Sequence, residues 1–494
     1  MPPFDRREFL KILGASAVAG PGLIACSKSD NGATTAPATT EAMPAPDPSA
    51  GFYDLPMQGN ARILHITDVH GQLNPVYFRE PNVNLGVGDA YGRPPHIVGK
   101  GFLEAMGLEP DSPEAYAYTY LNFASAAGKF GRTGGYAQMR TLLESLRASA
   151  GGKQNTLTLD GGDLWQGSGT SLWTRGVDMV EASNILGLDV MVGHWEFTYR
   201  EDEVLSNVAL FKGDFIGQNV RVKEDALFGD KYATMVEKYD GRGLYDEDTG
   251  HAFRPYVIKN VGGARICVVG QAFPRTANAN PQEFFPDWSF GLREDDMISL
   301  VEGIREDENP DAIVLLSHNG MDVDIKMAER VPGLNAVFGG HTHDGIPRPV
   351  EVKNVEGHTC LVTNAGSNSK FVGVMDFDIS EGKLNTMNYK MLPIISDWLE
   401  PDKEMQAFID QMRQTKYDET IIESRSSEFF YNPSRVGKTF EEILGEKRAI
   451  ADRVLSRRGN FMGTWDQVLC NALRHEYGAD IALSAGVRWG TTTL

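Results

Sequence analysis

Short apolar runs recur along the chain, and several of them end at a histidine or an aspartate. Such runs, bounded by glycines and polar residues, are typical of buried strands. The strands predicted in this way cover residues 63–66, 156–160, 188–192, 311–316, 335–338, 375–379, 384–391 and 481–484. Apolar residues at helical spacing predict helices over residues 137–146, 178–186, 401–417, 440–444 and 465–477. Because strands alternate with helices, we predict an α/β fold with ligands at the strand ends.

Five of the ten histidines stand just after a predicted strand. The first strand is followed by Asp68 and His70, and residues i and i+2 of an extended segment point to the same side. The later strands are followed by Asp163, His194, His318, His341 and His343. Imidazole and carboxylate groups without cysteine suit Mn, Fe or Zn. Seven such residues are too many for one catalytic ion but suit two ions that share a bridging carboxylate.

Composition narrows the classes of function. The 494 residues exceed what one ordinary core supports, so we expect two or more domains. The net charge of −20 argues against a nucleic-acid partner, because no basic surface would dominate. The four cysteines form no CxxC pair, so we expect neither a zinc knuckle nor a disulfide framework. Cys267 lies in an apolar run and is expected to be buried and inert.

Residues 1–26 have the form of an export signal. Arg6 and Arg7 precede a short Gly- and Ala-rich run, an order that resembles a twin-arginine signal. The run is too short for a membrane span, so we expect no transmembrane helix in the mature protein. Residues 23–26 also resemble a lipobox, which would make Cys26 a lipid anchor. We therefore expect a periplasmic protein, with a flexible linker over residues 27–56.

The order of the ligand motifs resembles the calcineurin-like metallophosphoesterases. The motifs are D-x-H from residue 68, G-D from 162, G-H-x-E from 193, H at 318 and G-H-x-H from 340. Residues 193–197, 339–343 and 486–488 further resemble the two-domain 5′-nucleotidase branch. Each motif is weak by itself, and their joint order carries the resemblance.

This resemblance implies an architecture and a set of roles. It implies a four-layer α/β/β/α sandwich at residues 57–400, a linker with a helix at 401–439, and a smaller α/β substrate-binding domain from 440 that we expect to be truncated at 494. One metal would be bound by Asp68, His70 and His343. The other metal would be bound by His194, His318 and His341. Asp163 would bridge the two ions and hold the attacking hydroxide, and the expected ions are two Mn²⁺ rather than Zn or Fe.

One motif departs from the nucleotidase pattern. Nucleotidases of this branch have Gly-Asn-His-Glu-Phe-Asp, in which the His and the final Asp form a catalytic pair beside the leaving group. Here Trp195 and Thr198 occupy those two positions, while His194 replaces the metal-binding Asn. A basic alkoxide needs a proton donor to leave, whereas a thiol with a pKa near about 8.5 does not. We therefore expect cleavage of a bond to sulfur.

The stretch from Gly193 to Tyr199 is similar to that of the thiosulfohydrolases of bacterial sulfur oxidation. That similarity implies removal of a terminal sulfonate, as sulfate, from a cysteine S-thiosulfonate on the periplasmic carrier SoxYZ. A periplasmic 5′-nucleotidase or phosphodiesterase with the same metals is the first alternative. A non-enzymatic exported protein that keeps an inactive phosphoesterase fold is the second.

Several residues are candidates for contacts with the substrate. Arg488 matches the arginine that binds the substrate anion in the resembling family. Residues 75–130, rich in Gly, Pro and Tyr, read as a long irregular excursion that either lines a channel or is an ordinary insertion. Trp195 and Tyr199 are candidate channel-lining residues, and so are Trp165, Gln166 and Trp173, which lie close in sequence to ligands. For the tryptophans, core packing is the favoured alternative role.

Overall fold

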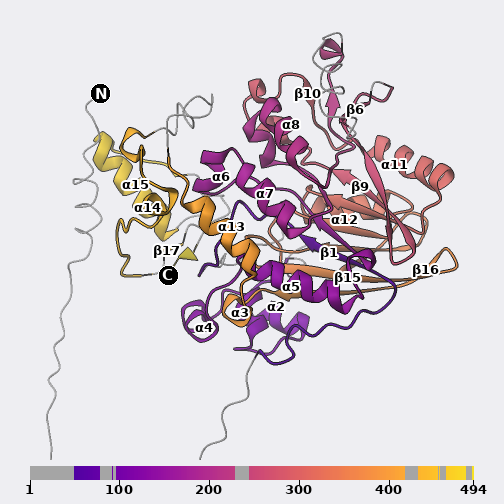
Figure 1. Ribbon diagram of the computed structural model, residues 1–494, viewed down its shortest axis with the longest axis horizontal. Coiled ribbons are helices and arrows are strands. Elements are labelled where there is room, and N and C mark those ends of the chain that lie inside the picture. Colours follow the sequence, from indigo (N-terminus) through magenta and orange to yellow (C-terminus); the bar gives the residue numbers. More distant parts are fainter. Residues whose placement is uncertain are drawn as a thin grey trace, which may run out of the picture. The chain divides into compact units, whose positions relative to one another are not determined.

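Two six-stranded mixed sheets carry the fold of residues 55–446 in this computed structural model (Figure 1). The structure describes residues 49–77, 92, 96–227, 244–246, 248–417, 432–453, 455–456, 463–484 and 492–493. The described residues before 55 and after 446 belong to a second unit. The chain is thus a mixed α/β protein with several sheets, as the hydrophobic pattern predicted.

In the first sheet four neighbouring parallel strands are joined to an antiparallel pair. Its order is β16 (Lys383–Pro393), β15 (Phe371–Ser380), β1 (Ala61–Ile66), β2 (Thr156–Asp160), β3 (Val190–Met191) and β4 (Asp214–Phe215). Strands β1 to β4 run parallel, whereas β15 runs antiparallel to both β1 and β16. The carboxyl ends of β1, β2 and β3 therefore meet at one edge of the sheet.

The second sheet has the same kind of parallel centre. Its order is β13 (Val350–Lys353), β14 (Thr359–Asn364), β12 (Ala336–Gly339), β11 (Ala312–Ser317), β9 (Ala264–Gln271) and β8 (Tyr256–Val261). Strands β14, β12, β11 and β9 run parallel. A smaller sheet consists of β10 (Trp288–Ser289), β5 (Arg221–Val222), β7 (His251–Phe253) and β6 (Leu244–Asp246).

One hydrophobic core joins the two large sheets. Its buried residues come from both, for example Ile63 of β1, Leu159 of β2, Val268 of β9 and Val314 of β11. A second core lies between the other face of the second sheet and helices α11 (Glu294–Gly303) and α12 (Met321–Arg330). Both faces of β11 are therefore buried, which explains its continuous apolar sequence.

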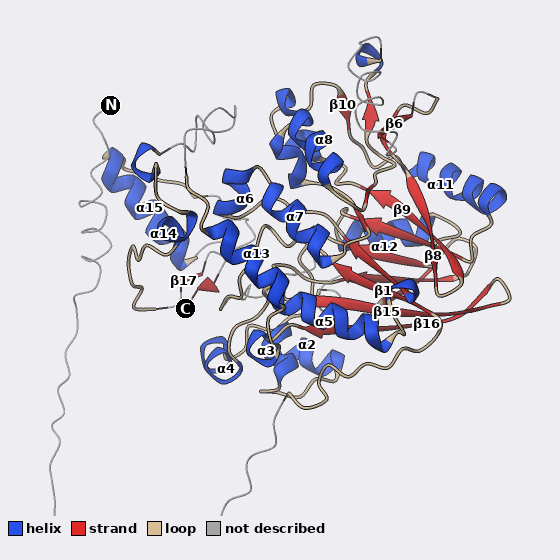
Figure 2. Cartoon of the chain, in the orientation of Figure 1, coloured by secondary structure: helices blue, strands red, loops and turns tan. Residues whose placement is uncertain are grey.

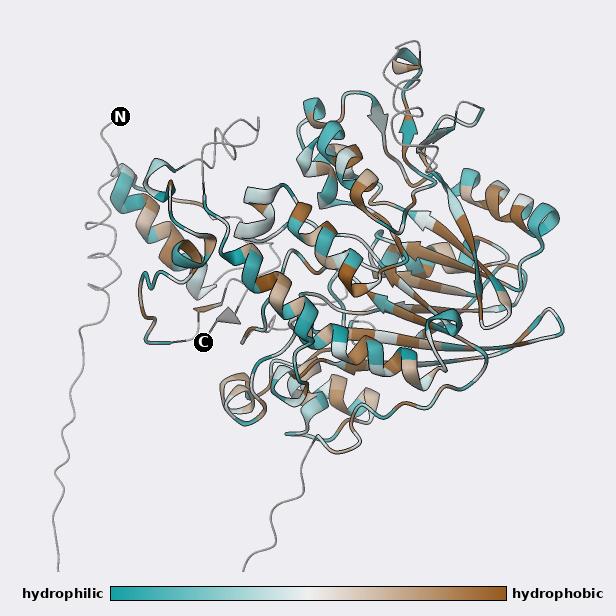
Figure 3. Ribbon diagram, viewed as in Figure 1, coloured by the Kyte–Doolittle hydropathy of each residue, from teal (hydrophilic) through white to brown (hydrophobic). Residues whose placement is uncertain are grey.

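Further helices lie around the sheets, and several of them pack on one another (Figure 2). They are α5 (Tyr136–Ser149), α6 (Gly169–Thr174), α7 (Val177–Leu186), α8 (Glu201–Leu210), α10 (Thr276–Ala279), α13 (Lys403–Arg413) and α14 (Phe440–Leu444). Arg147 of α5 donates to Thr158 Oγ1 of β2 and to the Leu186 carbonyl of α7, and so joins α5 to both elements. In Figure 3 the central strands are mainly hydrophobic, whereas the helices carry both hydrophobic and hydrophilic residues.

The excursion at residues 75–130 is not irregular where it is described. It contains α2 (Gly99–Met106), α3 (Pro113–Tyr118) and α4 (Phe123–Phe130). Ser112 caps α3, because its Oγ accepts a hydrogen bond from the Ala115 amide. The amino-acid composition of this stretch does not indicate such a cap. Phe102 and Tyr118 pack with Phe371 of β15, so these helices are part of a core.

Two other predictions about secondary structure need correction. Residues 481–484 form no strand, and Ile481 and Leu483 are 78% and 86% exposed. Asp68 and His70 lie beyond the end of β1 with positive φ angles of 51° and 53°, so they are not in an extended segment. Their common direction comes from a left-handed turn rather than from strand alternation.

The second unit contains α15 (Thr464–Tyr477) and a pair of short strands, β17 (Leu455–Ser456) and β18 (Thr492–Thr493). Cys26, the export signal and Arg488 lie outside the described residues. Within the part of the chain that the structure describes, Cys267 and Cys360 are buried free thiols, and Cys470 is also free. None of the described helices has the length and apolar character that crossing a membrane requires.

A buried ion pair fixes β1 against β15. Arg62 is fully buried and binds Asp376 through two hydrogen bonds, Nε to Oδ1 at 2.6 Å and Nη2 to Oδ2 at 2.8 Å. Its Nη1 donates to the carbonyls of Leu55 and Leu146. Because β1 leads directly to Asp68, this pair anchors the strand that presents the first candidate ligand.

We predict that Asp376→Asn destabilises the protein by about 3–5 kcal/mol, because it leaves the guanidinium of Arg62 buried without a counter-charge. The measurement is the free energy of unfolding in urea. The matched control is Asp397→Asn, which removes the half-exposed partner of Arg132 and should cost at most about 1 kcal/mol. Equal losses in the two variants would contradict the assignment of Arg62 as an anchor.

Candidate metal centre

All seven sequence-predicted ligands lie in two groups at the carboxyl ends of the parallel strands. We call Asp68, His70 and His343 cluster one, and Asp163, His194, His318 and His341 cluster two. Within each cluster the candidate ligand atoms lie within 4.8 Å of one another. The two clusters are consistent with a site for two metal ions.

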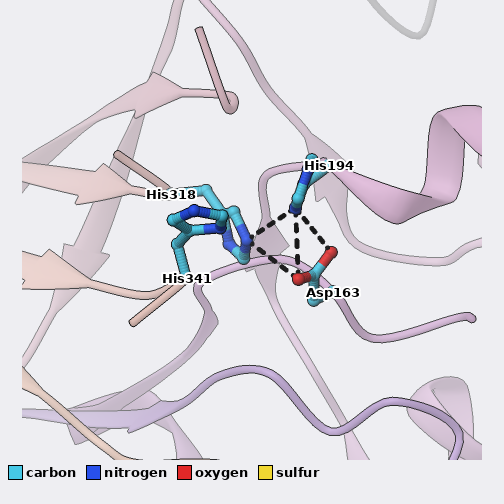
Figure 4. Close-up of side chains that lie close together, drawn as sticks. All are labelled: Asp163, His194, His318 and His341. Carbon is cyan, nitrogen blue, oxygen red and sulfur yellow. Dashed lines mark hydrogen bonds and ion pairs between the residues drawn. The ribbon is translucent and has the colours of Figure 1, made fainter. Parts of the chain in front are cut away.

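Cluster two is held together by short contacts to one carboxylate (Figure 4). Nδ1 of His194 lies 3.0 Å from Oδ1 of Asp163, and Nε2 of His318 lies 3.1 Å from Oδ2. The same two imidazole nitrogens lie 3.1 Å from each other. In Figure 4 the rings of His194 and His318 point toward Asp163.

Cluster one meets cluster two at the same carboxylate. Nε2 of His70 lies 3.1 Å from Nε2 of His343 and 3.7 Å from Oδ2 of Asp163. Nε2 of His343 lies 3.3 Å from Oδ1 of Asp68. Asp163 therefore contacts imidazoles of both clusters, which is the position that a bridging ligand requires.

The backbone is unusual at these residues. Five of the seven have positive φ angles between 51° and 73°, namely Asp68, His70, Asp163, His341 and His343. Non-glycine residues adopt this conformation at a cost of about 1–2 kcal/mol each. Close packing adds a further constraint, since a methyl group at Gly340 would lie 2.9 Å from Nδ1 of His318 and 3.0 Å from Oδ2 of Asp68.

Two buried carboxylates dominate the electrostatics. Asp68 is 0% exposed and Asp163 is 1% exposed. Burial by itself would raise the pKa of each, but neighbouring imidazoles outweigh it and lower both, that of Asp163 strongly. Burial likewise disfavours a charge on His318, yet Asp163 and Asp68 raise its pKa to about 10. The pair of carboxylates thus strongly attracts positive charge.

The donor atoms suit a cation. His318 Nδ1 lies 2.5 Å from the Gly161 carbonyl, and His70 Nδ1 lies 3.2 Å from the Gln166 carbonyl. A carbonyl only accepts, so each Nδ1 carries a proton and each Nε2 faces the clusters. At neutral pH His318 also holds a proton on Nε2, beside Asp163, and a bound cation would displace it. Buried carboxylates that converge in this way need positive charge beside them, which that proton or a metal ion supplies. The residues present therefore fit a pair of divalent ions.

Glu196 is a positioning residue to which the sequence analysis assigned no role. It is fully buried and accepts from the amides of His194 at 2.7 Å and Leu164 at 2.6 Å. It also accepts from the amides of Trp165 and Asp163. One carboxylate thus joins the turn after β2 to the turn after β3. The only signal in the sequence was its fixed place in the G-H-x-E motif.

The candidate substrate residues differ in their surroundings. Trp195 is half-buried, and its ring centroid lies 4.8 Å from that of His194. Tyr199 is only 4% exposed, and its hydroxyl lies 3.1 Å from the Trp165 carbonyl and 2.9 Å from the Ser171 carbonyl, so its role in lining a channel stays a prediction. Trp165 and Trp173 are also buried, in agreement with core packing.

Comparison with known proteins gives three informative similarities, although no protein-family model matches the chain. A solved structure of the sulfate thiohydrolase SoxB from Thermus thermophilus is 30% identical, with 86% of this chain and 69% of that chain covered and a TM-score of 0.69. Protein UshA from Yersinia enterocolitica is 26% identical over 60% of this chain, and the 5′-nucleotidase of Rattus norvegicus is 24% identical over 69%. The chain spans about half the length of these curated relatives, 55% of each.

We predict that Glu196→Gln loosens the metal centre, because its amide NH₂ would oppose backbone N–H donors. The expected loss is about 2–3 kcal/mol in the free energy of unfolding, with reduced affinity for Mn²⁺. Urea unfolding and equilibrium dialysis measure the two effects. The control is Glu201→Gln, a buried carboxylate at the start of α8 that accepts from the Asp287 amide. Unchanged Mn²⁺ affinity in Glu196→Gln would contradict the positioning role.

Proposed function

The chain belongs to the 5′-nucleotidase/metallophosphoesterase superfamily, and from this membership we propose that it is a thiosulfohydrolase of the SoxB type. At the level of the superfamily it is a hydrolase with two His/Asp clusters consistent with a two-metal site. The finer assignment names the reaction. We propose that it releases sulfate from a cysteine S-thiosulfonate on the carrier SoxYZ.

One observation carries this assignment. The motif positions at which related nucleotidases hold a catalytic His and Asp are occupied here by Trp195 and Thr198. The hydroxyl of Thr198 donates to Asn280 Oδ1, and Trp195 offers no proton-transfer group near neutral pH. A site that keeps its candidate metal ligands but lacks this acid suits a leaving group that departs without protonation.

The proposed reaction balances without a further reactant. The oxygen of a water molecule forms a bond to the sulfonate sulfur, and the S–S bond breaks. The electron pair of that bond stays with the sulfur on the cysteine, which leaves as a persulfide. Sulfate and protons are the other products. Persulfide sulfur is a weaker base than an alkoxide, so the step needs no general acid.

The residues of both clusters would hold two divalent ions, which we propose to be Mn²⁺. Such ions supply a water nucleophile of lowered pKa and positive charge beside the departing group. Asp163 is oriented for a bridging role by the amide of Trp195, which donates to its Oδ1 at 2.8 Å. Thr67 Oγ1 orients Asp68 by donating to Oδ2 at 2.6 Å.

Location and partner are part of the same proposal. The paired arginines at residues 6 and 7 support twin-arginine export to the periplasm, with Cys26 as a lipid anchor. Arg488, by its match to the family motif, would bind the sulfonate of the substrate. A substrate tethered to SoxYZ would need access to the metal centre, where Trp195 is half-buried and so reachable.

Hydrolysis of a phosphate ester is the second candidate function. The curated relatives include a 5′-nucleotidase. This alternative predicts that the protein loaded with Mn²⁺ releases phosphate from AMP.

We predict that protein loaded with Mn²⁺ releases sulfate from a carrier-bound cysteine S-thiosulfonate much faster than it releases phosphate from AMP. Chelation of the ions, or Asp163→Asn, should lower sulfate release at least about hundredfold, because the nucleophile would be lost. Ion chromatography measures sulfate, and a colorimetric assay measures phosphate. Rapid AMP hydrolysis without sulfate release would replace this proposal with the nucleotidase one.

We also predict that restoring the acid pair changes selectivity. Trp195→His with Thr198→Asp should raise AMP hydrolysis roughly ten- to hundredfold, since general acids contribute about 10²–10⁴ and an inserted pair is imperfectly placed. Sulfate release should not increase. The single change Trp195→Phe is the control, because it removes the indole without adding an acid. No gain in AMP hydrolysis by the double variant would count against the role assigned to the missing pair.

A further inference from the structure

The imidazoles of the metal centre are supported in two different ways. His318 and His70 each bind a backbone carbonyl through Nδ1, at 2.5 Å and 3.2 Å. This is the usual outer support of a metal-binding histidine, since it fixes both the tautomer and the ring plane. His194 and His341 differ. Nε2 of His194 and Nδ1 of His341 are buried and, among the described residues, have no hydrogen-bond partner.

Both of these rings lie against one phenylalanine instead. The ring centroid of Phe273 lies 4.2 Å from that of His341, at an interplanar angle of 29°. It lies 4.2 Å from that of His194 as well, at 49°. The third imidazole of cluster two, His318, is farther away at 6.4 Å. The ring of Phe273 thus contacts the two imidazoles of cluster two for which the described residues show no hydrogen bond from the ring to a backbone carbonyl.

The backbone holds Phe273 in this place. The residue follows the end of β9, and its amide donates to the Gly193 carbonyl, next to His194. The preceding residue, Ala272, exchanges two hydrogen bonds with the side chain of Asn219, each 2.8 Å long. Phe273 itself is half-buried. Its ring is therefore anchored by the second sheet and the turn after β3 rather than by the metal centre.

We infer that Phe273 is a positioning residue that holds His194 and His341 in their metal-binding orientation through ring contact, stacked on His341 and tilted against His194. Close contact with a fixed aromatic ring restricts rotation of both imidazoles about χ2, which a hydrogen bond does for His318 and His70. Loss of the ring would weaken binding of the ion in cluster two more than that in cluster one. The inference rests on the proposed two-metal centre and not on the identity of the substrate.

The test measures Mn²⁺ binding to variants by equilibrium dialysis with metal analysis. Phe273→Leu keeps apolar bulk but removes the flat ring, and we expect one of two ions to bind roughly 10–100-fold more weakly. Phe273→Tyr keeps the ring and should bind both ions as the wild type does. Phe284→Ala is the control, because that ring lies in the same segment and packs on Arg200 instead of an imidazole. Circular dichroism during heating of the chelated proteins compares their folds.

The outcomes separate this inference from the proposed function. Two tight ions in Phe273→Leu would overturn it, as would equal losses in Phe273→Leu and Phe273→Tyr, which would indicate packing rather than stacking. Equal weakening of both ions would overturn it as well. A wild-type protein that binds fewer than two ions would refute the two-metal centre itself. If Phe273→Leu melts early after chelation, Phe273→Trp provides a second comparison with the ring retained.

Discussion

Two carboxylates without solvent contact set the conditions for the rest of this structure. Asp68 and Asp163 are buried at the ends of neighbouring strands, where an uncompensated charge would cost several kcal/mol. Five imidazoles surround them, and together the seven residues form an environment that favours cations. Positive charge at this point, from the protonated His318 or from bound ions, is therefore needed to offset the burial of the two carboxylates.

The surrounding sheets and turns stabilise this buried arrangement of carboxylates and imidazoles. The two sheets bring the carboxyl ends of β1, β2 and β3 near those of β11 and β12, and a shared apolar core fixes their separation. Most of the candidate ligands adopt left-handed backbone angles, which only a firmly held turn maintains. Glu196 helps to fix these turns, because its carboxylate accepts hydrogen bonds from four backbone amides in two of them. Strain at the site is therefore balanced by stability in the sheets and in the buried polar contacts beneath it.

In this chain the neighbourhood of His194 is aromatic, since its ring contacts those of both Trp195 and Phe273. An aromatic flank orients imidazoles but donates no proton to a leaving group. The aromatic residues beside His194 therefore account for two features together, the missing acid pair in the sequence and the ring contacts that support cluster two in the structure.

The sequence by itself determined the parts that depend on local periodicity and on motif order. The apolar runs predicted β1, β2, β11 and β12, and the polar residues after them identified the seven residues that the structure brings together. Helix spacing likewise predicted α5, α7 and α13. These patterns can be read from the sequence because burial of one strand, or of one helix face, requires apolar residues at regular spacing along the chain.

Only the tertiary structure decided features that join distant segments. It placed Asp163 between two sets of imidazoles, Glu196 beneath two turns, and Phe273 against His194 and His341. It also buried Tyr199 and folded the supposed irregular excursion into helices that pack on β15. None of these contacts has a periodic signature, because each depends on how strands remote in sequence align across the sheets. The left-handed backbone angles at Asp68 and His70 could not be predicted from the sequence for the same reason, because the contacts that stabilise them come from elsewhere in the chain.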